Sequence, residues 1–442
     1  MARVAFVSPL PPERTGIATY AATVLDGVAD TRTEHRIDRL WPLGRDALAR
    51  VREADVAIYQ IGNNVEFHGD IYALSVWNPS VVVVHDLAID GLIWGLGEVR
   101  SPLAAPARAE AMLAARAGAD PDDPLAIPWC AQLVRRARSV VVHSRFAKEY
   151  LESFGCRTPV VVVPHPVVER DAAIDRARAR RDATRARAVR SDGILVGVAG
   201  DLNATKGIEQ LLEALPSVGS NVRLALVGRR AGWDLDAAIR ASGVGDRVTV
   251  VRDVSDDDFL DWLCAFDVLV NLRYPHRGET SGSLVRALHA GTPTIVSAIG
   301  TYLEVPDDVV VRIAPGPPDP VELAAAIERL AADAPGREAM GERARRYAQT
   351  ELTPARTAAG YLQAIDDVLA LRADPARGAL ARWAFALRDL GVTPHLAERG
   401  FGVGYADALA DLRTARLKVR IPGGTRWPDL LLGRHGGAPS CS

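Results

Sequence analysis

The sequence predicts an α/β protein with two doubly wound, Rossmann-like parallel-sheet domains that face each other across a cleft. Short runs of Val and Ile recur along the chain without polar alternation, which is typical of parallel strands covered on both faces. Longer helical patterns separate these runs, as expected for strand–helix units. The runs form two independent series, and 442 residues are too many for one hydrophobic core.

The first series predicts an N-terminal domain over residues 1–168. Its expected strands are at residues 4–7, 56–59, 81–84, 140–142 and 160–163. An Arg/Ala-rich stretch over residues 169–192 then contains no strand pattern, and we expect it to be a linker that is partly helical. The ligand site of an open parallel sheet lies at the carboxyl ends of its strands, so functional side chains are expected there.

The second series predicts a C-terminal domain over residues 193–355. Its expected strands are at residues 194–199, 224–227, 248–251, 268–271, 294–296 and 309–313. A helix over residues 356–372 is expected to cross back to the N-terminal domain. Residues 373–442 are expected to be an additional tail, helical in part and, in its Gly/Pro-rich end, disordered.

Composition excludes several functional classes. A net charge of -2 does not suit a nucleic-acid-binding protein, which usually carries a basic excess. The four cysteines are scattered without CxxC spacing, so we expect neither a metal site nor another cofactor. The chain turns to proline before a secretory apolar region could form, and no apolar run reaches the roughly 18 residues of a membrane span. We therefore expect a cytoplasmic protein and leave peripheral membrane contact open.

Lys206 is the most conspicuous single residue, because the chain has three lysines among 53 basic residues. It follows the predicted strand 194–199 and a glycine turn, and it precedes a helical pattern. An ammonium on a flexible stem can neutralise a phosphate at such a position. The alternative is an ordinary solvated surface lysine.

Three candidates follow the strands of the first series. Gly16 opens a helix after the first strand, where bare backbone can approach an anion, although it can equally serve the turn alone. His85 and Asp86 follow the strand at residues 81–84, and a histidine there can contact a sugar or transfer a proton. A structural role for His85 is the alternative. His143 is a weaker candidate, and His165, between Pro164 and Pro166, is weaker still and is expected to belong to the interdomain corner.

The segment 271–293 contains the strongest pattern. A strand, a polar glycine-bearing loop and a helix that ends at Gly291 follow one another. The amides at the helix N-terminus, from Ser281, Gly282, Ser283 and Leu284, predict an anion site. Glu279 disfavours phosphate beside it and is better suited to accept hydrogen bonds from hydroxyl groups. Together these features indicate a nucleotide-sugar site.

These motifs resemble those of GT-B glycosyltransferases of the large retaining family 4, over roughly residues 3–372. The matching segments are Pro-Pro-x-x-x-Gly-Ile at 11–17, Val-His-Asp at 84–86, Lys206-Gly207, Glu279-x-x-Gly282 and Ala-Leu-His-Ala-Gly-Thr-Pro at 287–293. The resemblance implies a metal-independent transferase that moves a sugar from a nucleoside-diphosphate sugar to an acceptor hydroxyl and retains the anomeric configuration. The donor would bind the C-terminal domain, and an unidentified glycan, lipid-linked or small-molecule acceptor the N-terminal one.

The resemblance also implies residue roles. Lys206 would meet the diphosphate, Glu279 the donor sugar and His85 the reacting sugar, while Gly16 would line the first loop. Two positions depart from the family pattern: Arg286 stands where a second acid usually takes the ribose hydroxyls, and Asp201 stands where an arginine is usual.

We assign Arg286 and Asp86 to sugar or ribose binding beside Glu279. We also keep two alternatives for the whole protein. One is a nucleotide-sugar epimerase of the same fold, and the other is a non-catalytic, glycosyltransferase-like scaffold.

Overall fold

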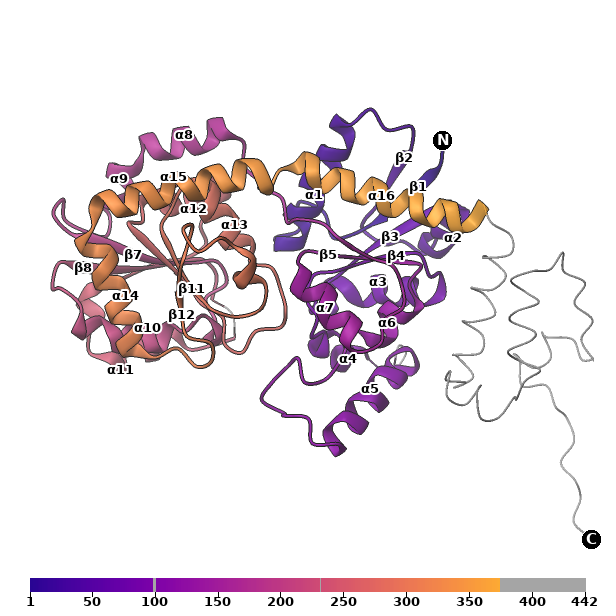
Figure 1. Cartoon of the computed structure of the whole chain (residues 1–442), viewed down its shortest axis with the longest axis horizontal. Coiled ribbons are helices and arrows are strands. Elements are labelled where there is room, and N and C mark those ends of the chain that lie inside the picture. Colours follow the sequence, from indigo (N-terminus) through magenta and orange to yellow (C-terminus); the bar gives the residue numbers. More distant parts are fainter. Residues whose placement is uncertain (98–100, 231, 374–442) are drawn as a thin grey trace, which may run out of the picture. The chain divides into compact units, whose positions relative to one another are not determined.

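The structure, a computed structural model, describes residues 1–97, 101–230 and 232–373 (Figure 1). Met1–Leu369 form one compact unit that contains two parallel sheets, and a second unit begins at Ala370. Most of the predicted tail, residues 374–442, lies outside the described residues. In the described ranges no helix is both long and apolar enough to cross a membrane.

The first sheet has six parallel strands in the order β2-β1-β3-β4-β5-β6. Their bounds are Arg3–Val7 (β1), Arg36–Leu40 (β2), Val56–Ile61 (β3), Val81–Val84 (β4), Ser139–Val142 (β5) and Val160–Val162 (β6). The strand β2 was not predicted, because its sequence Arg-Ile-Asp-Arg-Leu is largely polar. An edge strand pairs on one side only and remains partly exposed, so it lacks the apolar run of a central strand.

Helices cover both faces of this sheet. Side chains of α1 (Gly16–Asp30) and α16 (Pro354–Ala373) form one apolar core with it. The other face packs against the helices that follow β2 to β5. These are α2 (Ala47–Glu53), α3 (Val65–Trp77), α4 (Asp90–Gly95), α5 (Ser101–Arg116), α6 (Ala131–Arg136) and α7 (Arg145–Ser153). We call this sheet and its helices the N-terminal lobe; α16 therefore returns to it from the end of the described chain.

The second sheet has the strand order β12-β11-β10-β7-β8-β9, again with every strand parallel. The strands are Ile194–Ala199 (β7), Val222–Val227 (β8), Val248–Val251 (β9), Val268–Asn271 (β10), Thr294–Ser297 (β11) and Val311–Ile313 (β12). Successive strands run outward from β7 in one direction and from β10 in the other. The strand order thus reverses between β7 and β10, and ligands of doubly wound sheets bind at such a point.

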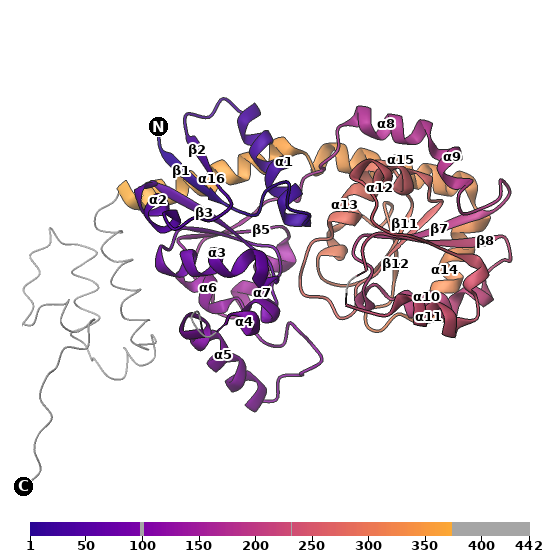
Figure 2. The same ribbon diagram turned by 180° about the vertical axis from the view of Figure 1, so that it is seen from behind.

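Helices of the second lobe also lie on both sheet faces, as the two opposite views show (Figure 1, Figure 2). One face carries α10 (Ile208–Ala214), α11 (Leu235–Ser242) and α14 (Pro320–Ala332). The other carries α8 (Asp171–Ala179), α12 (Asp256–Ala265) and α13 (Gly282–Ala290). The remaining elements are α9 (Arg181–Arg185), α15 (Ala334–Glu351) and the short 3₁₀ turns η1 (Ala204–Lys206), η2 (Leu215–Ser217), η3 (Gly245–Arg247) and η4 (Gly300–Glu304).

Direct hydrogen bonds join the two lobes beside the carboxyl ends of the strands. The amides of Leu87 and Ala88 donate to the carbonyl oxygen of Arg277, at 2.9 and 3.1 Å. On a second connection, the carboxylate of Glu304 accepts from the amides of Arg145 and Phe146 at the start of α7, at 3.0 and 2.8 Å. The first pair of bonds brings the loop between β10 and α13 against the turn that follows β4, and the second brings residue Glu304 against the start of α7.

Candidate functional site

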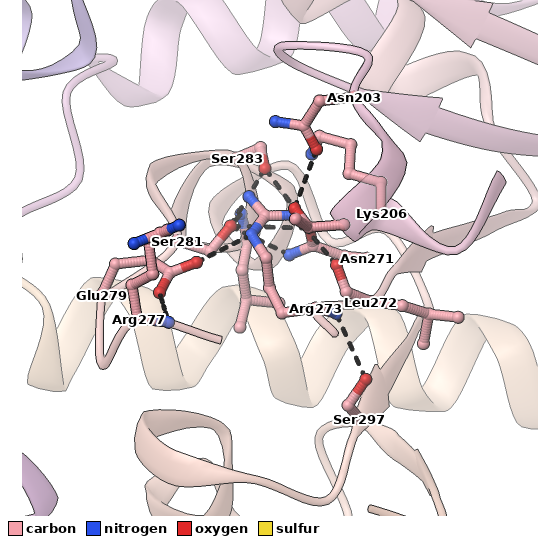
Figure 3. Close-up of polar contacts among 12 residues, drawn as sticks. Asn203, Lys206, Asn271, Leu272, Arg273, Arg277, Glu279, Ser281, Ser283 and Ser297 are labelled. Atoms are coloured by element: carbon pink, nitrogen blue, oxygen red, sulfur yellow. Dashed lines mark hydrogen bonds and ion pairs between the residues drawn. The ribbon is translucent and has the colours of Figure 1, made fainter. Parts of the chain in front are cut away.

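The predicted residues of the second lobe gather where its strand order reverses. The turn after β7 contributes Lys206, and the loop after β10 contributes Arg273 and Glu279. A backbone hydrogen bond from Tyr274 to the Thr205 carbonyl, 2.8 Å long, holds the two loops together. Two segments almost seventy residues apart therefore build one polar cluster (Figure 3).

Lys206 is buried, with 2% of its surface exposed, so it is not a solvated surface lysine. Its Nζ donates to the carbonyl oxygen of Ala199, the last residue of β7, at 2.8 Å. A side chain at Gly200 would place its Cβ 3.5 Å from that Nζ and 3.7 Å from the Cβ of Ser283. Burial lowers the pKa of Lys206 well below its usual value, and the nearby guanidinium of Arg273 lowers it further. An anion arriving here would favour the charged ammonium.

Glu279 lies between two donors from its own loop. Its Oε1 accepts from Nε of Arg273 at 3.1 Å, and its Oε2 accepts from the Arg277 amide at 2.7 Å (Figure 3). A carboxylate offers about four acceptor positions, so two remain for other donors. Arg273 is largely buried and also donates to the Leu272 carbonyl. Arg273 lies two residues after the end of β10, at the same sheet edge as Lys206.

The N-terminus of α13 borders the polar cluster formed by Lys206, Arg273 and Glu279. Ser281 caps the helix, and its Oγ accepts from the Leu284 amide at 3.3 Å. The Leu284 amide is thus already paired, which corrects the prediction of four open amides. Among the described residues, the amides of Ser281, Gly282 and Ser283 have no hydrogen-bond partner. Asn271 holds the cap through its Nδ2, 3.1 Å from the Ser281 Oγ.

One prediction about local structure in this region is confirmed. Gly291 ends α13 in the left-handed conformation, with φ of 74°, as a C-cap glycine does. The acidic run after β9 begins α12, where the Ser255 side chain caps the helix by accepting from the Asp258 amide. No group of His, Cys, Asp or Glu within the described ranges has an arrangement suited to a metal ion.

The predicted residues of the N-terminal lobe lie at the end of β4. His85 Nε2 is 2.7 Å from Oε1 of Gln60, a side chain from β3. Asp86 accepts from the Asn63 amide at 2.9 Å. Burial raises the pKa of Asp86 to about 7, and the Glu279 carboxylate from the other lobe raises it as well. Two carboxyl groups from different lobes are therefore close enough to influence each other.

Gly16 and Asp201 lie at the edge of this region. Gly16 is exposed at the first position of α1, and a Cβ there would meet nothing within 4 Å. Asp201, which replaces a usual arginine, accepts from Nε and Nη2 of Arg229 at 3.0 and 2.9 Å. Arg229 also donates to the Arg14 carbonyl in the loop before Gly16. The acid is thus paired with a cation from the end of β8.

Arg286 is engaged within the protein. Its Nε donates to Oε1 of Glu169, and its guanidinium lies over the Phe259 ring, 4.4 Å from the ring centre. Both partners of the ion pair are largely buried. Oε2 of Glu169 is buried without a partner among the described residues. The residue predicted to bind ribose is therefore held by an acid from the linker.

A family comparison matches the lobe that contains the charged cluster. The model of the family Glycosyl transferases group 1 matches residues 193–333, from the start of β7 to the end of α14. This part of the chain is similar to the group 1 glycosyl transferases. A curated relative, D-inositol 3-phosphate glycosyltransferase from Xylanimonas cellulosilytica, is 31% identical over 148 residues. That match covers 32% of this chain and 35% of the relative, so it spans about a third of the relative's length.

Solved glycosyl transferase structures resemble most of the described chain. Sucrose-phosphate synthase from Thermosynechococcus elongatus has a TM-score of 0.60 at 17% identity, covering 84% of this chain and 100% of that one. HepE from Anabaena, solved with UDP and glucose, has a TM-score of 0.56 at 15% identity, covering 83% and 100%. WaaG, involved in lipopolysaccharide biosynthesis, has 0.53 at 17%, covering 81% and 99%. The predicted GT-B fold is therefore confirmed.

Proposed function

We propose that this protein is a group 1 glycosyltransferase that moves a sugar from a nucleoside-diphosphate sugar to an acceptor hydroxyl. The proposal includes retention of the anomeric configuration and needs no metal or other cofactor. The observation that carries it is the cluster formed by Lys206, Arg273, Glu279 and the open amides of α13. Two cationic side chains and a helix N-terminus suit a diphosphate, while the carboxylate suits sugar hydroxyls.

The positive charge that the cluster carries once Lys206 is protonated supports an anionic ligand. Lys206 is buried, Arg273 is largely buried, and Glu279 is the carboxylate that pairs with Arg273. Buried like charges raise each other's free energy unless an anion compensates them. A diphosphate at the N-terminus of α13 would do so, and it would also satisfy the amides of Gly282 and Ser283. HepE, one of the similar structures, was solved with UDP-glucose, which supports a nucleotide sugar as donor.

The proposed reaction breaks the bond between the anomeric carbon and the diphosphate oxygen. The electron pair stays on the diphosphate, while the acceptor oxygen attacks the same face of the sugar and passes its proton to the departing phosphate. Lys206 and the helix amides stabilise the charge that grows on the leaving group; removal of one such donor commonly costs about 10²–10³ in rate. Glu279 orients the donor sugar, and His85 and Asp86 lie beside the reacting end.

A thermal-shift screen of UDP, GDP, ADP and TDP, each with and without magnesium, tests this proposal. Ligand at about 100 times its dissociation constant should add roughly 2.7 kcal/mol to the free energy of unfolding. We expect one nucleotide to raise the melting temperature independently of magnesium, and the shift to be lost in Lys206→Met. If titration to millimolar concentration gives no shift with any nucleotide, the scaffold alternative holds instead.

A further inference from the structure

Three adjacent strands of the N-terminal lobe are each followed by a histidine. His85 follows β4, His143 follows β5, and His165 lies three residues after β6. The ring centres of His85 and His143 are 4.9 Å apart, and those of His143 and His165 are 6.0 Å apart. Tyr20 of α1 contacts all three rings, with centres at 4.8 to 5.0 Å. We call these three histidines the histidine cluster.

Backbone carbonyl groups fix the tautomers of two members. Nδ1 of His143 lies 3.0 Å from the Val163 carbonyl oxygen, and Nδ1 of His165 lies 3.0 Å from that of Pro166. A carbonyl oxygen can only accept, so each Nδ1 must carry the hydrogen. Burial lowers the pKa of His143 to about 3 and that of His165 to about 4, so both rings are neutral at pH 7. Each Nε2 therefore presents a lone pair.

Hydrogen bonds between side chains hold His85 in the opposite tautomer from that of His143 and His165. Its Nε2 faces Oε1 of Gln60, which accepts, so Nδ1 of His85 carries the lone pair. The amide nitrogen of Gln60 donates to the Tyr361 hydroxyl at 2.9 Å, in agreement with this orientation of the amide. The Tyr361 hydroxyl also lies 2.9 Å from that of Tyr20. Burial and the neighbouring histidines keep the pKa of His85 well below its usual value.

The cluster adjoins the N-terminus of α13. Nε2 of His165 lies 3.7 Å from the position that a Cβ of Gly282 would occupy. Nε2 of His143 is buried and has no hydrogen-bond partner in the described part of the chain. A buried acceptor without a donor costs free energy that a ligand hydroxyl would recover. None of the three histidines is fully buried as a residue.

Two cationic side chains of α7, the helix that follows His143, have acidic partners. Arg145 lies 3.6 Å from Glu304, and Lys148 lies 3.9 Å from Glu152. Arg277, from the other lobe, pairs with Asp90. A phosphate bound at the histidine cluster would face ring nitrogens that carry lone pairs and would find no unpaired cation among these side chains. Hydroxyl groups of a ligand would instead donate hydrogen bonds to those ring nitrogens.

We propose that the histidine cluster is the acceptor subsite and selects an uncharged polyhydroxyl compound, such as a sugar or cyclitol, through hydrogen bonds from its hydroxyl groups. This inference rests on the proposed glycosyl transfer and names the substrate class of its second substrate. A phosphorylated acceptor is the alternative outcome, because the curated relative is named for an inositol phosphate.

Saturation-transfer NMR on the full chain with UDP bound can test the subsite, with glucose, myo-inositol and their monophosphates as probes. We expect at least one neutral compound to bind about tenfold more tightly than its monophosphate. His143→Asn keeps a donor for the Val163 carbonyl but removes the distal acceptor, so it should weaken that binding about tenfold. His143→Gln restores an acceptor oxygen and should recover most of it. His35→Asn, at a histidine outside the cluster that contacts Asp366, is the matched control and should change nothing.

Tighter binding of a monophosphate would overturn the proposal, as would unchanged binding in His143→Asn. Selective ¹⁵N labelling of the histidines gives an independent readout. Resonances of His143 and His165 should show neutral rings protonated at Nδ1, and protonation at Nε2 would overturn the proposed subsite. The thermal shift with nucleotide separates the two hypotheses. If UDP still stabilises the chain while the polyols fail to bind, the donor site stands and the acceptor subsite does not.

Discussion

Two regions at equivalent positions of similar sheets differ in their electrostatics. The carboxyl end of the second sheet carries Lys206, Arg273 and Glu279, which are charged groups or groups that an anion would charge. The carboxyl end of the first sheet carries the histidine cluster, in which burial favours the neutral rings. Both regions bury polar atoms, but the end of the second sheet is suited to an anion and the end of the first sheet is suited to hydroxyl groups. The chemistry of the residues after each strand, and not the fold, sets this difference.

The largest effects should come from the charged region. Lys206→Met keeps the buried volume but removes the amine, and Glu279→Ala removes the carboxylate. We expect each change to lower the transfer rate by at least about 10²-fold, because a donor to the leaving group or an acceptor for the sugar is lost. Steady-state kinetics with the nucleotide sugar identified by thermal shift would measure this. Lys206→Arg should restore only part of the rate, because a planar guanidinium fits a point-charge site poorly. Near-normal rates in Lys206→Met and Glu279→Ala would contradict the site assignment.

A second prediction separates ribose binding from internal pairing at Arg286. Arg286→Ala leaves the largely buried carboxylate of Glu169 without its cation, and breaking such a pair typically costs about 3–5 kcal/mol. Urea denaturation should therefore show a large loss of stability. The variant Arg286→Met/Glu169→Gln removes both charges and should recover much of it. If instead Arg286→Ala unfolds like the unchanged protein but binds nucleotide more weakly, the ribose prediction is favoured.

Because the histidines at the carboxyl end of the first sheet are held neutral by burial, we expect the free energy of unfolding to depend on pH. In the folded chain burial lowers the pKa of His68 to about 4, of His165 to about 4 and of His143 to about 3. The unfolded chain takes up protons near pH 6.5, so stability should fall as the pH drops from about 6.5 toward 4. Each histidine contributes up to about 1.4 kcal/mol per pH unit.

Asp86 acts in the opposite direction, because its folded pKa of about 7 exceeds the usual value and it binds a proton first in the folded chain. Its contribution to stability rises as the pH falls through 7 and offsets roughly one histidine. Denaturation at pH 7.5, 6.5 and 5.5 should still show a net loss, with a smaller slope in His143→Asn. A flat or rising profile would mean that the rings are not held neutral.

The smallest effect is expected at Asp201, which forms an exposed ion pair with Arg229. Arg229 and Asp201 are each about half exposed, at 52% and 51% of their side chains. Arg229→Ala should change the free energy of unfolding by no more than about 1 kcal/mol. It should nevertheless weaken nucleotide binding, because Asp201 then places an unpaired negative charge beside Lys206. Parallel thermal melts with and without the nucleotide would separate the two effects. Tighter nucleotide binding would contradict this interpretation of Asp201.

The sequence predicted those parts of the fold that depend on local patterns. Buried parallel strands form unbroken apolar runs, so ten of the eleven predicted strands agree closely with the observed bounds. The exception is the predicted strand 309–313, which contains the shorter β12. Gly291 was recognisable as the end of a helix because a left-handed backbone conformation is needed there. The strand β2 was missed because its polar edge sequence resembles a loop.

The sequence by itself determined that Lys206, Glu279 and the α13 N-terminus belong to one strand-end region, because parallel strands end at the same sheet edge. Only the tertiary structure decided the state of these groups. It buried Lys206, placed Arg273 between it and Glu279, and paired Arg286 with Glu169. It also gathered His85, His143 and His165, which lie up to eighty residues apart in the chain. Burial and long-range pairing arise from contacts between distant segments, so no local pattern of residues encodes them.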